Sequence, residues 1–183
     1  IRYATIGEVS WNNSHPFVAT DASGRIWTLI HNGTVFEFEP SSHFVKTQKG
    51  ETDSERILLY IIERMNDEIR DKGSFPDAKR RFEILDDIIT SMSKGNKLNL
   101  VIYDEELIYF HTNCAETLYK REEDDFFMLS TKPLSFGRWE AVPRLTVFAY
   151  KQNMPVFKGQ KKSSEYIEDQ EHIDRLYLAY SQL

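Results

Sequence analysis

The chain has 183 residues, of which 40% are hydrophobic and 28% are charged, a composition typical of one globular domain with a sizeable core. Its formal net charge of −6 argues against nucleic acid and anionic membranes as partners, because contacts with phosphate groups need clustered Lys and Arg side chains. No apolar run approaches the roughly 20 residues that span a bilayer, and the first residues lack the basic and apolar parts of a signal peptide. We therefore expect a small molecule as the ligand, and the sequence leaves a homo-oligomer open.

The chain holds a single cysteine, Cys114, so no internal disulfide can form. This favours a reducing, cytoplasmic setting. Five scattered histidines and one cysteine also lack the ligand spacing of a structural zinc site, so we expect neither a metal nor another cofactor.

The first residues have the pattern of a strand that is already under way. Ile1 is not an initiator methionine, and residues 1–5 include β-favouring side chains. We therefore expect the full-length protein to have a segment before Ile1. Further along, β-rich runs at residues 26–30 and 34–38 flank the tripeptide 31–33, His-Asn-Gly, which predicts a hairpin.

Two amphipathic helices are expected in the middle of the chain. Apolar residues recur at helical spacing and predict a first helix from about residue 54 to residue 70. Thr52 and Glu55 have the spacing of a capping box at its start. A second helix ends near Gly95 and carries five apolar residues on one face: Phe82, Leu85, Ile88, Ile89 and Met92.

The second half of the chain has mainly strand patterns. Residues 98–103 and 107–111 flank an acidic turn and predict a hairpin, and the further candidate strands are 118–120, 126–130 and 146–150. Hairpins around a helical middle, without alternating βα units, indicate a layered α+β fold. Residues 158–164 have the composition of a flexible join, followed by a polar helix from about residue 165 to residue 180.

Three sites could bind or activate a substrate, and the first is Arg2. Arginine is rarely fully buried, so the simplest interpretation of Arg2 is a surface charge. Alternatively, its planar guanidinium holds a substrate carboxylate through two parallel hydrogen bonds.

The second site is the Asn32-Gly33 pair. Between two strands this dipeptide is typical of a turn, because both residues tolerate positive φ. The functional interpretation is an oxyanion hole, in which the Asn32 side-chain amide and the Gly33 backbone N–H point to the negative charge that develops on an attacked carbonyl. Glycine also lets a substrate approach the backbone closely.

The third site is Asp53, near the start of the first helix. An acidic residue there commonly satisfies free backbone N–H groups. The alternative is a carboxylate that faces a substrate ammonium group. Arg2 and Asp53 would then hold the two charged ends of an α-amino acid, with Asn32 and Gly33 at its reacting carbonyl.

The order of these motifs resembles a known family. The motifs are Arg2-x-Ala4-Thr5-x-Gly7, Asn13-x-His15-Pro16, His31-Asn32-Gly33 and Thr52-Asp53-Ser54-Glu55. As a set they resemble the class II glutamine amidotransferases of the N-terminal nucleophile hydrolase superfamily, and the compact stand-alone members most. The resemblance covers residues 1–158, the C-terminal portion of such a domain, and leaves 159–183 as a linker and C-terminal helix.

The resemblance implies a four-layer α/β/β/α sandwich of two antiparallel sheets whose N-terminal part is missing from this chain. It also implies glutamine or a γ-glutamyl compound as the substrate. By family position, Arg2 holds the substrate α-carboxylate, Asp53 holds its α-amino group, and Asn32 and Gly33 form the oxyanion hole. Thr5 and His15 match positions that line or support the pocket, and for His15 a role in buttressing the core is the alternative.

The nucleophile is where the sequence departs from the family. The family uses a cysteine at the mature N-terminus, whose own α-amino group is the base. Ile1 has no nucleophilic side chain, and Cys114 is internal and interpreted as a small buried hydrophobe. Ile6 also stands where some branches place a histidine. We therefore expect this chain alone to be inactive.

Two functions of different class follow from these observations. The first is hydrolysis of the γ-amide of glutamine or of a γ-glutamyl compound, through a thioester on a cysteine in the missing segment. The enzyme would either release ammonia for a synthase or stand alone and trim γ-glutamyl peptides, and the sequence favours the stand-alone form. The alternative is a non-catalytic amidotransferase-like domain that binds a γ-glutamyl ligand or acts as a scaffold. A Met-Cys start of the encoding gene would favour the enzyme.

Overall fold

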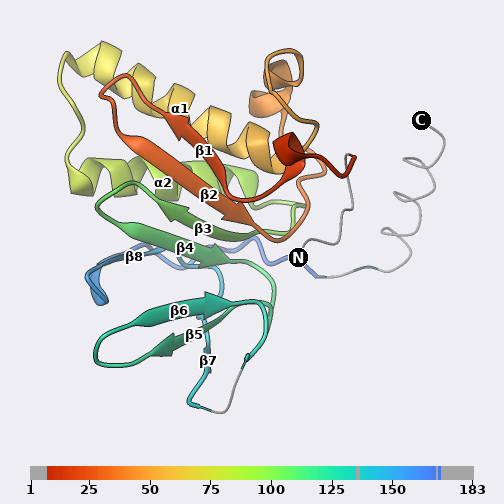
Figure 1. The fold of residues 1–183 in the computed structure, drawn as a ribbon, viewed down its shortest axis with the longest axis vertical. Helices are drawn as coiled ribbons and strands as arrows, with labels where there is room; N and C mark the ends of the chain where they lie inside the picture. The colour runs from red at the N-terminus through yellow and green to blue at the C-terminus, as the bar shows by residue number, and fades with distance from the viewer. Residues whose placement is uncertain (1–7, 135–136, 168, 170–183) are drawn as a thin grey trace.

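The computed structural model describes residues 8–134, 137–167 and 169, and Figure 1 shows their arrangement. One sheet has six strands in the order β1-β2-β3-β4-β8-β9, and a second has three strands in the order β6-β5-β7. Every pairing between neighbouring strands is antiparallel. The larger sheet consists of β1 (Phe17–Thr20), β2 (Ile26–His31), β3 (Asn99–Tyr103), β4 (Ile108–Thr112), β8 (Phe148–Lys151) and β9 (Met154–Lys158). The smaller sheet consists of β5 (Tyr119–Glu122), β6 (Phe127–Ser130) and β7 (Glu140–Ala141).

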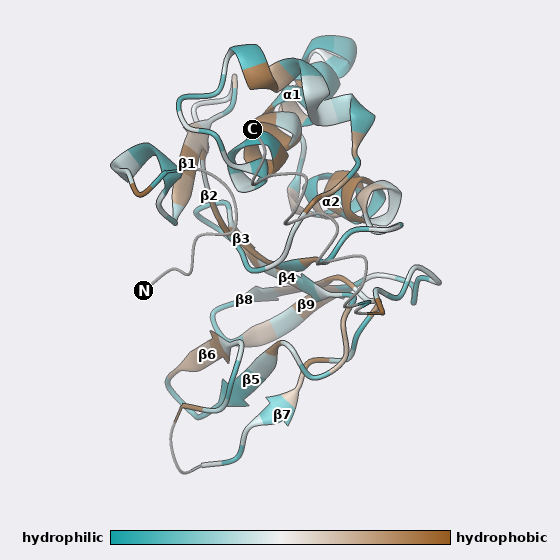
Figure 2. Cartoon of the chain, turned by 90° about the vertical axis from the view of Figure 1, so that its right-hand side faces the viewer, coloured by the Kyte–Doolittle hydropathy of each residue, from teal (hydrophilic) through white to brown (hydrophobic). Residues whose placement is uncertain are grey.

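The larger sheet forms the middle layer of the described residues. Helices α1 (Asp53–Lys72) and α2 (Ala78–Met92) lie on one side of it, and the smaller sheet lies on the other (Figure 1 and Figure 2). Short 3-10 helices, η1 (Trp11–Asn13) and η2 (Glu39–Lys46), flank this arrangement. The expected α+β class with two antiparallel sheets is therefore confirmed, and the described residues account for three of the four expected layers.

Helix α1 begins and ends as its sequence predicts, within two residues. Thr52 is the N-cap, and its hydroxyl accepts a hydrogen bond from the Glu55 N–H at 3.2 Å. The Glu55 carboxylate does not complete the capping box on Thr52. It accepts hydrogen bonds from the N–H groups of Lys49 and Gly50, both at 2.7 Å, and so holds the loop before the helix. Gly73 ends the helix in the left-handed conformation, with φ of 65°.

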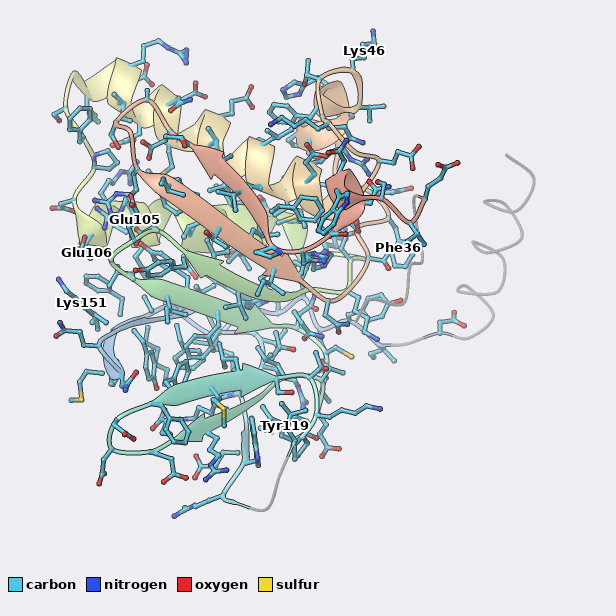
Figure 3. All side chains as sticks on the ribbon, in the orientation of Figure 1. Phe36, Lys46, Glu105, Glu106, Tyr119 and Lys151 are labelled. Atoms are coloured by element: carbon cyan, nitrogen blue, oxygen red, sulfur yellow. The ribbon has the colours of Figure 1, made fainter. Side chains whose placement is uncertain are left out.

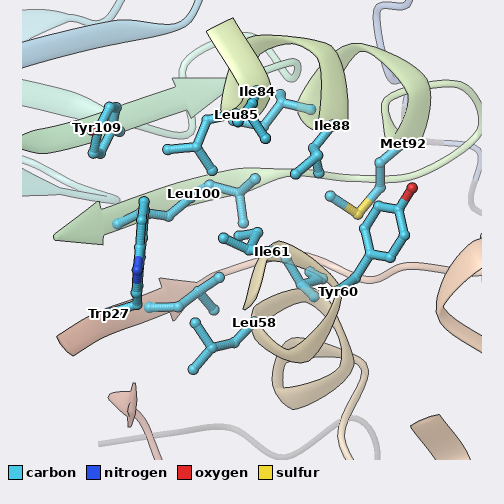
Figure 4. Packing of buried hydrophobic residues seen from close by; sticks show 14 of the residues in the cluster. Trp27, Leu58, Tyr60, Ile61, Ile84, Leu85, Ile88, Met92, Leu100 and Tyr109 are labelled. Carbon is cyan, nitrogen blue, oxygen red and sulfur yellow. The ribbon is translucent and has the colours of Figure 1, made fainter. Parts of the chain in front are cut away.

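The main core lies between the two helices and the sheet face that they cover. Trp27, Leu29 and Ile61 are fully buried there, and Figure 4 shows how the side chains of α1, α2 and the sheet interdigitate. Each fully buried large apolar side chain contributes about 1.5–3 kcal/mol relative to exposure. The apolar spacing that predicted both helices is thus the surface that packs on the sheet.

The opposite face of the larger sheet is covered unevenly. A second, smaller cluster under the smaller sheet includes Phe110 and Tyr150. On the β1–β3 part of the same face, four large apolar side chains are between 42% and 59% exposed: Val18, Ile26, Ile30 and Tyr103.

The hairpin expected around residues 31–33 is wrong. Strand β2 pairs with β1 on one side and with β3 on the other, and residues 34–38 form no strand beyond a single bridge from Thr34 to Lys97. The N–H groups of Asn32 and Thr34 donate to the carbonyls of Asn99 and Lys97, at 2.9 and 3.0 Å. The His-Asn-Gly segment therefore continues along the partner strand, because backbone pairing there replaces the tight turn that Asn-Gly also permits.

Most other strand predictions are confirmed. Strands β3 and β4 form the expected hairpin, and β5, β6 and β8 correspond to the other three candidate strands. Strands β1, β7 and β9 were not predicted. The predicted helix at about 165–180 lies largely outside the described residues. In the expected join, the N–H groups of Gly159 and Lys162 donate to the carbonyls of Val147 and Leu145, at 2.9 and 2.7 Å.

A buried ion pair holds the β3–β4 hairpin against α2. Arg81 Nε lies 2.6 Å from Asp104 Oδ2, and the two side chains are 3% and 0% exposed. Asp104 also accepts a hydrogen bond from the Tyr109 hydroxyl at 2.8 Å. Glu106 binds both Arg81, at 2.6 Å, and Lys151, at 2.9 Å, and Figure 3 shows Glu106 and Lys151 at the same end of the sheet. Hydrogen bonds from Lys151 and Arg81 lower the pKa of Glu106 to about 2.

Replacing Arg81 should therefore be costly. Arg81→Met leaves the Asp104 carboxylate buried without its ion partner, and we expect the free energy of unfolding to fall by about 3–5 kcal/mol. Arg80→Met is the matched control, because Arg80 is 43% exposed in its contact with Glu68, and exposed pairs contribute less than about 1 kcal/mol. Urea denaturation at pH 7 measures both. Equal losses in the two variants would contradict this assignment.

His111 is a second buried titratable group. It is fully buried, its Nδ1 lies 3.3 Å from the Thr146 carbonyl oxygen, and its Nε2 has no hydrogen-bond partner among the residues described. Burial lowers the pKa of His111 from 6.5 to about 4. Between these two pH values the unfolded state binds the proton that the folded state excludes.

The free energy of unfolding should therefore fall as the pH is lowered from about 6.5 to about 4, and His111 should account for about 3 kcal/mol of that fall. His111→Gln should flatten this part of the profile, whatever its effect at pH 7. His43→Gln is the control, since the His43 side chain is 54% exposed. The measurement is denaturation at several pH values, and parallel profiles for the wild type and His111→Gln would refute the assignment.

Candidate functional site

The end of β2 opens onto a pocket between the two sheets. The pocket has a volume of about 330 Å³, and most of its lining is apolar, including Ile30, Val101 and Leu129. Asn32 and Asn99 are among its few polar residues. A mostly apolar hollow with a few placed polar groups is typical of a site for a small molecule.

The side chain of Asn32 is held in one orientation. Asn99 Nδ2 donates a hydrogen bond to Asn32 Oδ1 at 3.1 Å, so the Asn32 oxygen is occupied. Asn32 is exposed, and no acceptor within the described part of the chain takes a hydrogen bond from its Nδ2. Asn32 therefore presents a donor, which is the polarity that an oxyanion requires.

Gly33 supplies a second donor next to the first. The N–H groups on either side of it, from Asn32 and Thr34, point to the partner strand, so the Gly33 N–H points away from that strand. Only glycine fits here, because a Cβ on residue 33 would lie 1.9 Å from the Lys97 carbonyl oxygen. Two adjacent residues thus present one side-chain donor and one backbone donor. Their role as an oxyanion hole stays a prediction.

His31 lies behind these donors, on the other side of the sheet, and no role for it was predicted from the sequence. It is buried, with Nε2 3.2 Å from the Lys97 carbonyl oxygen and Nδ1 3.1 Å from the Ser54 hydroxyl. A carbonyl only accepts, so Nε2 donates to it. The Ser54 hydroxyl lies within reach of both His31 Nδ1 and, at 3.4 Å, Asp53 Oδ1. The alternation of side chains along the strand indicates that His31 is buried, because Trp27, Leu29 and His31 all face the core.

Asp53 lies beside this segment, at the first residue of α1. It is 6% exposed, and its two carboxylate oxygens accept hydrogen bonds from the N–H groups of Val35 and Ser54, each at 2.8 Å. Its Oδ2 is 4.0 Å from His31 Nδ1. These contacts show a helix-start acid that also anchors the chain just after Gly33. Binding of a substrate ammonium by Asp53 stays a prediction.

Of the other residues singled out in the sequence, the structure describes some but not all. His15 is half-buried, and its ring packs edge-on against Phe17, a core residue, with the ring centroids 4.9 Å apart. This contact favours the buttressing role for His15. Cys114 is buried, as expected for an internal hydrophobe. Arg2 and Thr5 lie outside the described residues, so their roles stay predictions.

The described residues were also compared with the requirements for a metal site and for a membrane-spanning helix. Within residues 8–134, 137–167 and 169, no three His, Cys, Asp or Glu side chains are grouped so as to hold a metal ion. No helix in the same ranges has the length and apolar composition needed to cross a membrane.

The fold is similar to that of known amidotransferase structures. A predicted glutamine amidotransferase from Pseudomonas aeruginosa superposes with a TM-score of 0.66 at 20% identity, covering 80% of this chain and 66% of that one. The glutamine phosphoribosylpyrophosphate amidotransferase of B. subtilis superposes with a TM-score of 0.60 at 13% identity, covering 88% of this chain and 34% of that one. At these identities the likeness concerns the fold alone.

Sequence relatives agree with the fold. Two proteins named "Putative glutamine amidotransferase", from Haemophilus influenzae and, as YafJ, from Escherichia coli, are 29% and 30% identical over 120 residues. Each match covers 65% of this chain but only 38% and 45% of those proteins, so the chain spans less than half of their length. The family described as class II glutamine amidotransferases matches residues 1–127, which include Asn32, Gly33 and Asp53. The chain belongs to the class II glutamine amidotransferases.

Proposed function

We propose that the full-length protein hydrolyses the γ-amide of glutamine or of a γ-glutamyl compound, with a nucleophilic cysteine that lies outside this chain. Family membership supports chemistry on the glutamine amide in general. The observation that carries the proposal is the orientation of Asn32, whose oxygen is held by Asn99 at 3.1 Å while its Nδ2 is left to donate beside the Gly33 N–H.

The proposed reaction has two steps. The cysteine thiolate attacks the γ-carbonyl carbon, and the carbonyl oxygen becomes an oxyanion that Asn32 Nδ2 and the Gly33 N–H stabilise. The cysteine α-amino group, having taken the thiol proton, gives a proton to the leaving nitrogen, and ammonia or an amine departs from a γ-glutamyl thioester. Water then attacks the thioester, passing again through an oxyanion, and releases glutamate and the free thiol.

The charged ends of the substrate are proposed to be held on either side of this centre. Arg2 would bind the α-carboxylate through its planar guanidinium, with Thr5 beside it. Asp53 would bind the α-ammonium. Its carboxylate oxygens each accept one backbone hydrogen bond and retain further lone pairs for a cation. We favour the stand-alone enzyme that acts on γ-glutamyl compounds over an ammonia donor for a synthase.

Asn32→Ala tests the oxyanion hole. We expect kcat for glutamine hydrolysis by the full-length protein to fall roughly 10²–10³-fold with little change in KM, since one donor to the developing charge is lost. Asn66→Ala is the control, because Asn66 lies on α1 and binds the Ala22 N–H, away from the pocket. The 183-residue chain without the preceding segment should show no turnover. Undiminished kcat in Asn32→Ala, with a folded protein by circular dichroism, would refute the assignment.

Asp53→Asn tests the ammonium site. Removing the charge should raise KM about tenfold to a hundredfold, because a charge-assisted hydrogen bond contributes roughly 1.5–3 kcal/mol. The amide has one acceptor oxygen for the two N–H groups of Val35 and Ser54, so we also expect some loss of stability. Asp77→Asn, at the N-cap of α2, is the matched control and should leave KM unchanged. If Asp53→Asn destabilises the protein without raising KM, Asp53 is only an anchor for the helix.

The alternative function is a non-catalytic binding domain, and experiments on the full-length protein distinguish it from the enzyme. If the residue after the initiator methionine in the encoding gene is a cysteine, and its replacement by alanine abolishes turnover, the enzyme is supported. Binding of glutamine by titration calorimetry with no turnover by the intact protein would instead support the binding module.

A further inference from the structure

A row of polar side chains crosses three neighbouring strands at the pocket. Asn32, Asn99 and Thr112 lie directly opposite one another on β2, β3 and β4 or their ends. The next row on the same face is apolar and consists of Ile30, Val101 and Phe110. Asn99 and Thr112 are 3% and 1% exposed, so the polar row is buried except at its Asn32 end.

The hydrogen bonds along this row run in one direction. The Cys114 backbone N–H donates to Thr112 Oγ1 at 3.3 Å, and the Thr112 hydroxyl donates to Asn99 Oδ1 at 2.6 Å. Asn99 Nδ2 donates to Asn32 Oδ1 at 3.1 Å. A backbone N–H can only donate, so Thr112 Oγ1 accepts there. The one proton of the Thr112 hydroxyl lies within reach of Asn99 Oδ1 and, at 3.0 Å, of the Cys114 carbonyl oxygen, and the contact with Asn99 is the shorter of the two.

A second hydroxyl supports the same orientation of Asn99. Thr117 Oγ1 lies 2.9 Å from Asn99 Oδ1 and 2.9 Å from the Cys114 carbonyl oxygen. The Asn99 oxygen is thus surrounded by hydroxyl groups, and its nitrogen is turned to Asn32. Buried polar groups on an otherwise apolar sheet face are costly unless they are hydrogen-bonded, and both Asn99 and Thr112 have hydrogen-bond partners.

We propose that Asn99 is a positioning residue that fixes the orientation of the Asn32 amide, so that Asn32 offers its Nδ2 and not its oxygen to the reacting carbonyl. This inference rests on the proposed function. An amide rotated by 180° would direct an oxygen at the developing oxyanion, which would destabilise the charge instead of stabilising it. Thr112 and Thr117 act one step further back, by holding the Asn99 oxygen.

Asn99→Asp is the sharpest test. The new carboxylate has the shape of the amide and can still accept from Thr112, but it cannot donate to Asn32. Asn32 must then turn its Nδ2 to the carboxylate, and its oxygen faces the substrate. We expect kcat of the full-length protein to fall roughly 10²–10³-fold, as for loss of an oxyanion donor, with KM changed less than about twofold.

Thr112→Val is the second variant, in case the first one does not fold. It keeps the shape of the side chain and removes the hydroxyl that orients Asn99, so kcat should fall, and Thr112→Ser should restore it. Thr28→Val is the matched control, because Thr28 lies on the same sheet face and its hydroxyl makes no hydrogen bond within the part of the chain that the structure describes. A purely structural role for the row would lower stability in Asn99→Asp and Thr112→Val without a selective loss of kcat.

A spectroscopic measurement separates this inference from the proposed function. The side-chain ¹⁵N–¹H₂ signals of Asn32, identified by their loss in Asn32→Asp, should shift strongly in Asn99→Asp, because the Nδ2 protons become bonded to a carboxylate. If the wild type turns over no glutamine but these signals shift, the proposed function fails and the positioning role stands. If they do not move, or if kcat is unchanged in an active protein, Asn99 does not position Asn32.

Discussion

The antiparallel pairing between the end of β2 and the chain entering β3 is the constraint on which the site depends. It binds the N–H groups of Asn32 and Thr34 to the partner strand and leaves the Gly33 N–H on the open side. The same pairing brings the backbone so close to Lys97 that residue 33 has no space for a Cβ. It also places Asn99 beside Asn32, 67 residues away in sequence. One short ladder thus fixes the position and the polarity of both donors.

The first turn of α1 holds that ladder from the helical side. Ser54 binds the ring of His31, and Asp53 binds the Val35 N–H, so the segment between them is fixed at both ends. The helix can serve this purpose because its apolar face is anchored in the main core through residues such as Ile61 and Met65, which are fully buried. The site is therefore as rigid as the packing between α1 and the sheet, and this rigidity is what a preorganised oxyanion hole needs.

The sequence predicted those features that depend on neighbouring residues. Helices α1 and α2 were predicted from apolar residues at helical spacing, and the β3–β4 hairpin from the acidic turn between two β-rich runs. These are local patterns, and all three elements are confirmed. The hairpin at residues 31–33 was wrong because Asn-Gly suits both a tight turn and a close strand crossing, and only the distant partner strand decides between them. Asn99 and Thr112 could not have been assigned from one sequence, because their role arises from strands that meet only in the fold. The pairing of Arg2 with Asp53 stays a prediction.

The uneven covering of the larger sheet has a consequence for handling the protein. Val18, Ile26, Ile30 and Tyr103 form an apolar band on one face of β1–β3, next to the pocket, and each is more than two fifths exposed. Binding of another apolar surface to this band is favourable, because it removes apolar side chains from water. Salts that are excluded from protein surfaces, such as sulfate, strengthen this binding. The 183-residue chain should therefore be retained on phenyl resin at moderate ammonium sulfate and should elute as the salt is withdrawn.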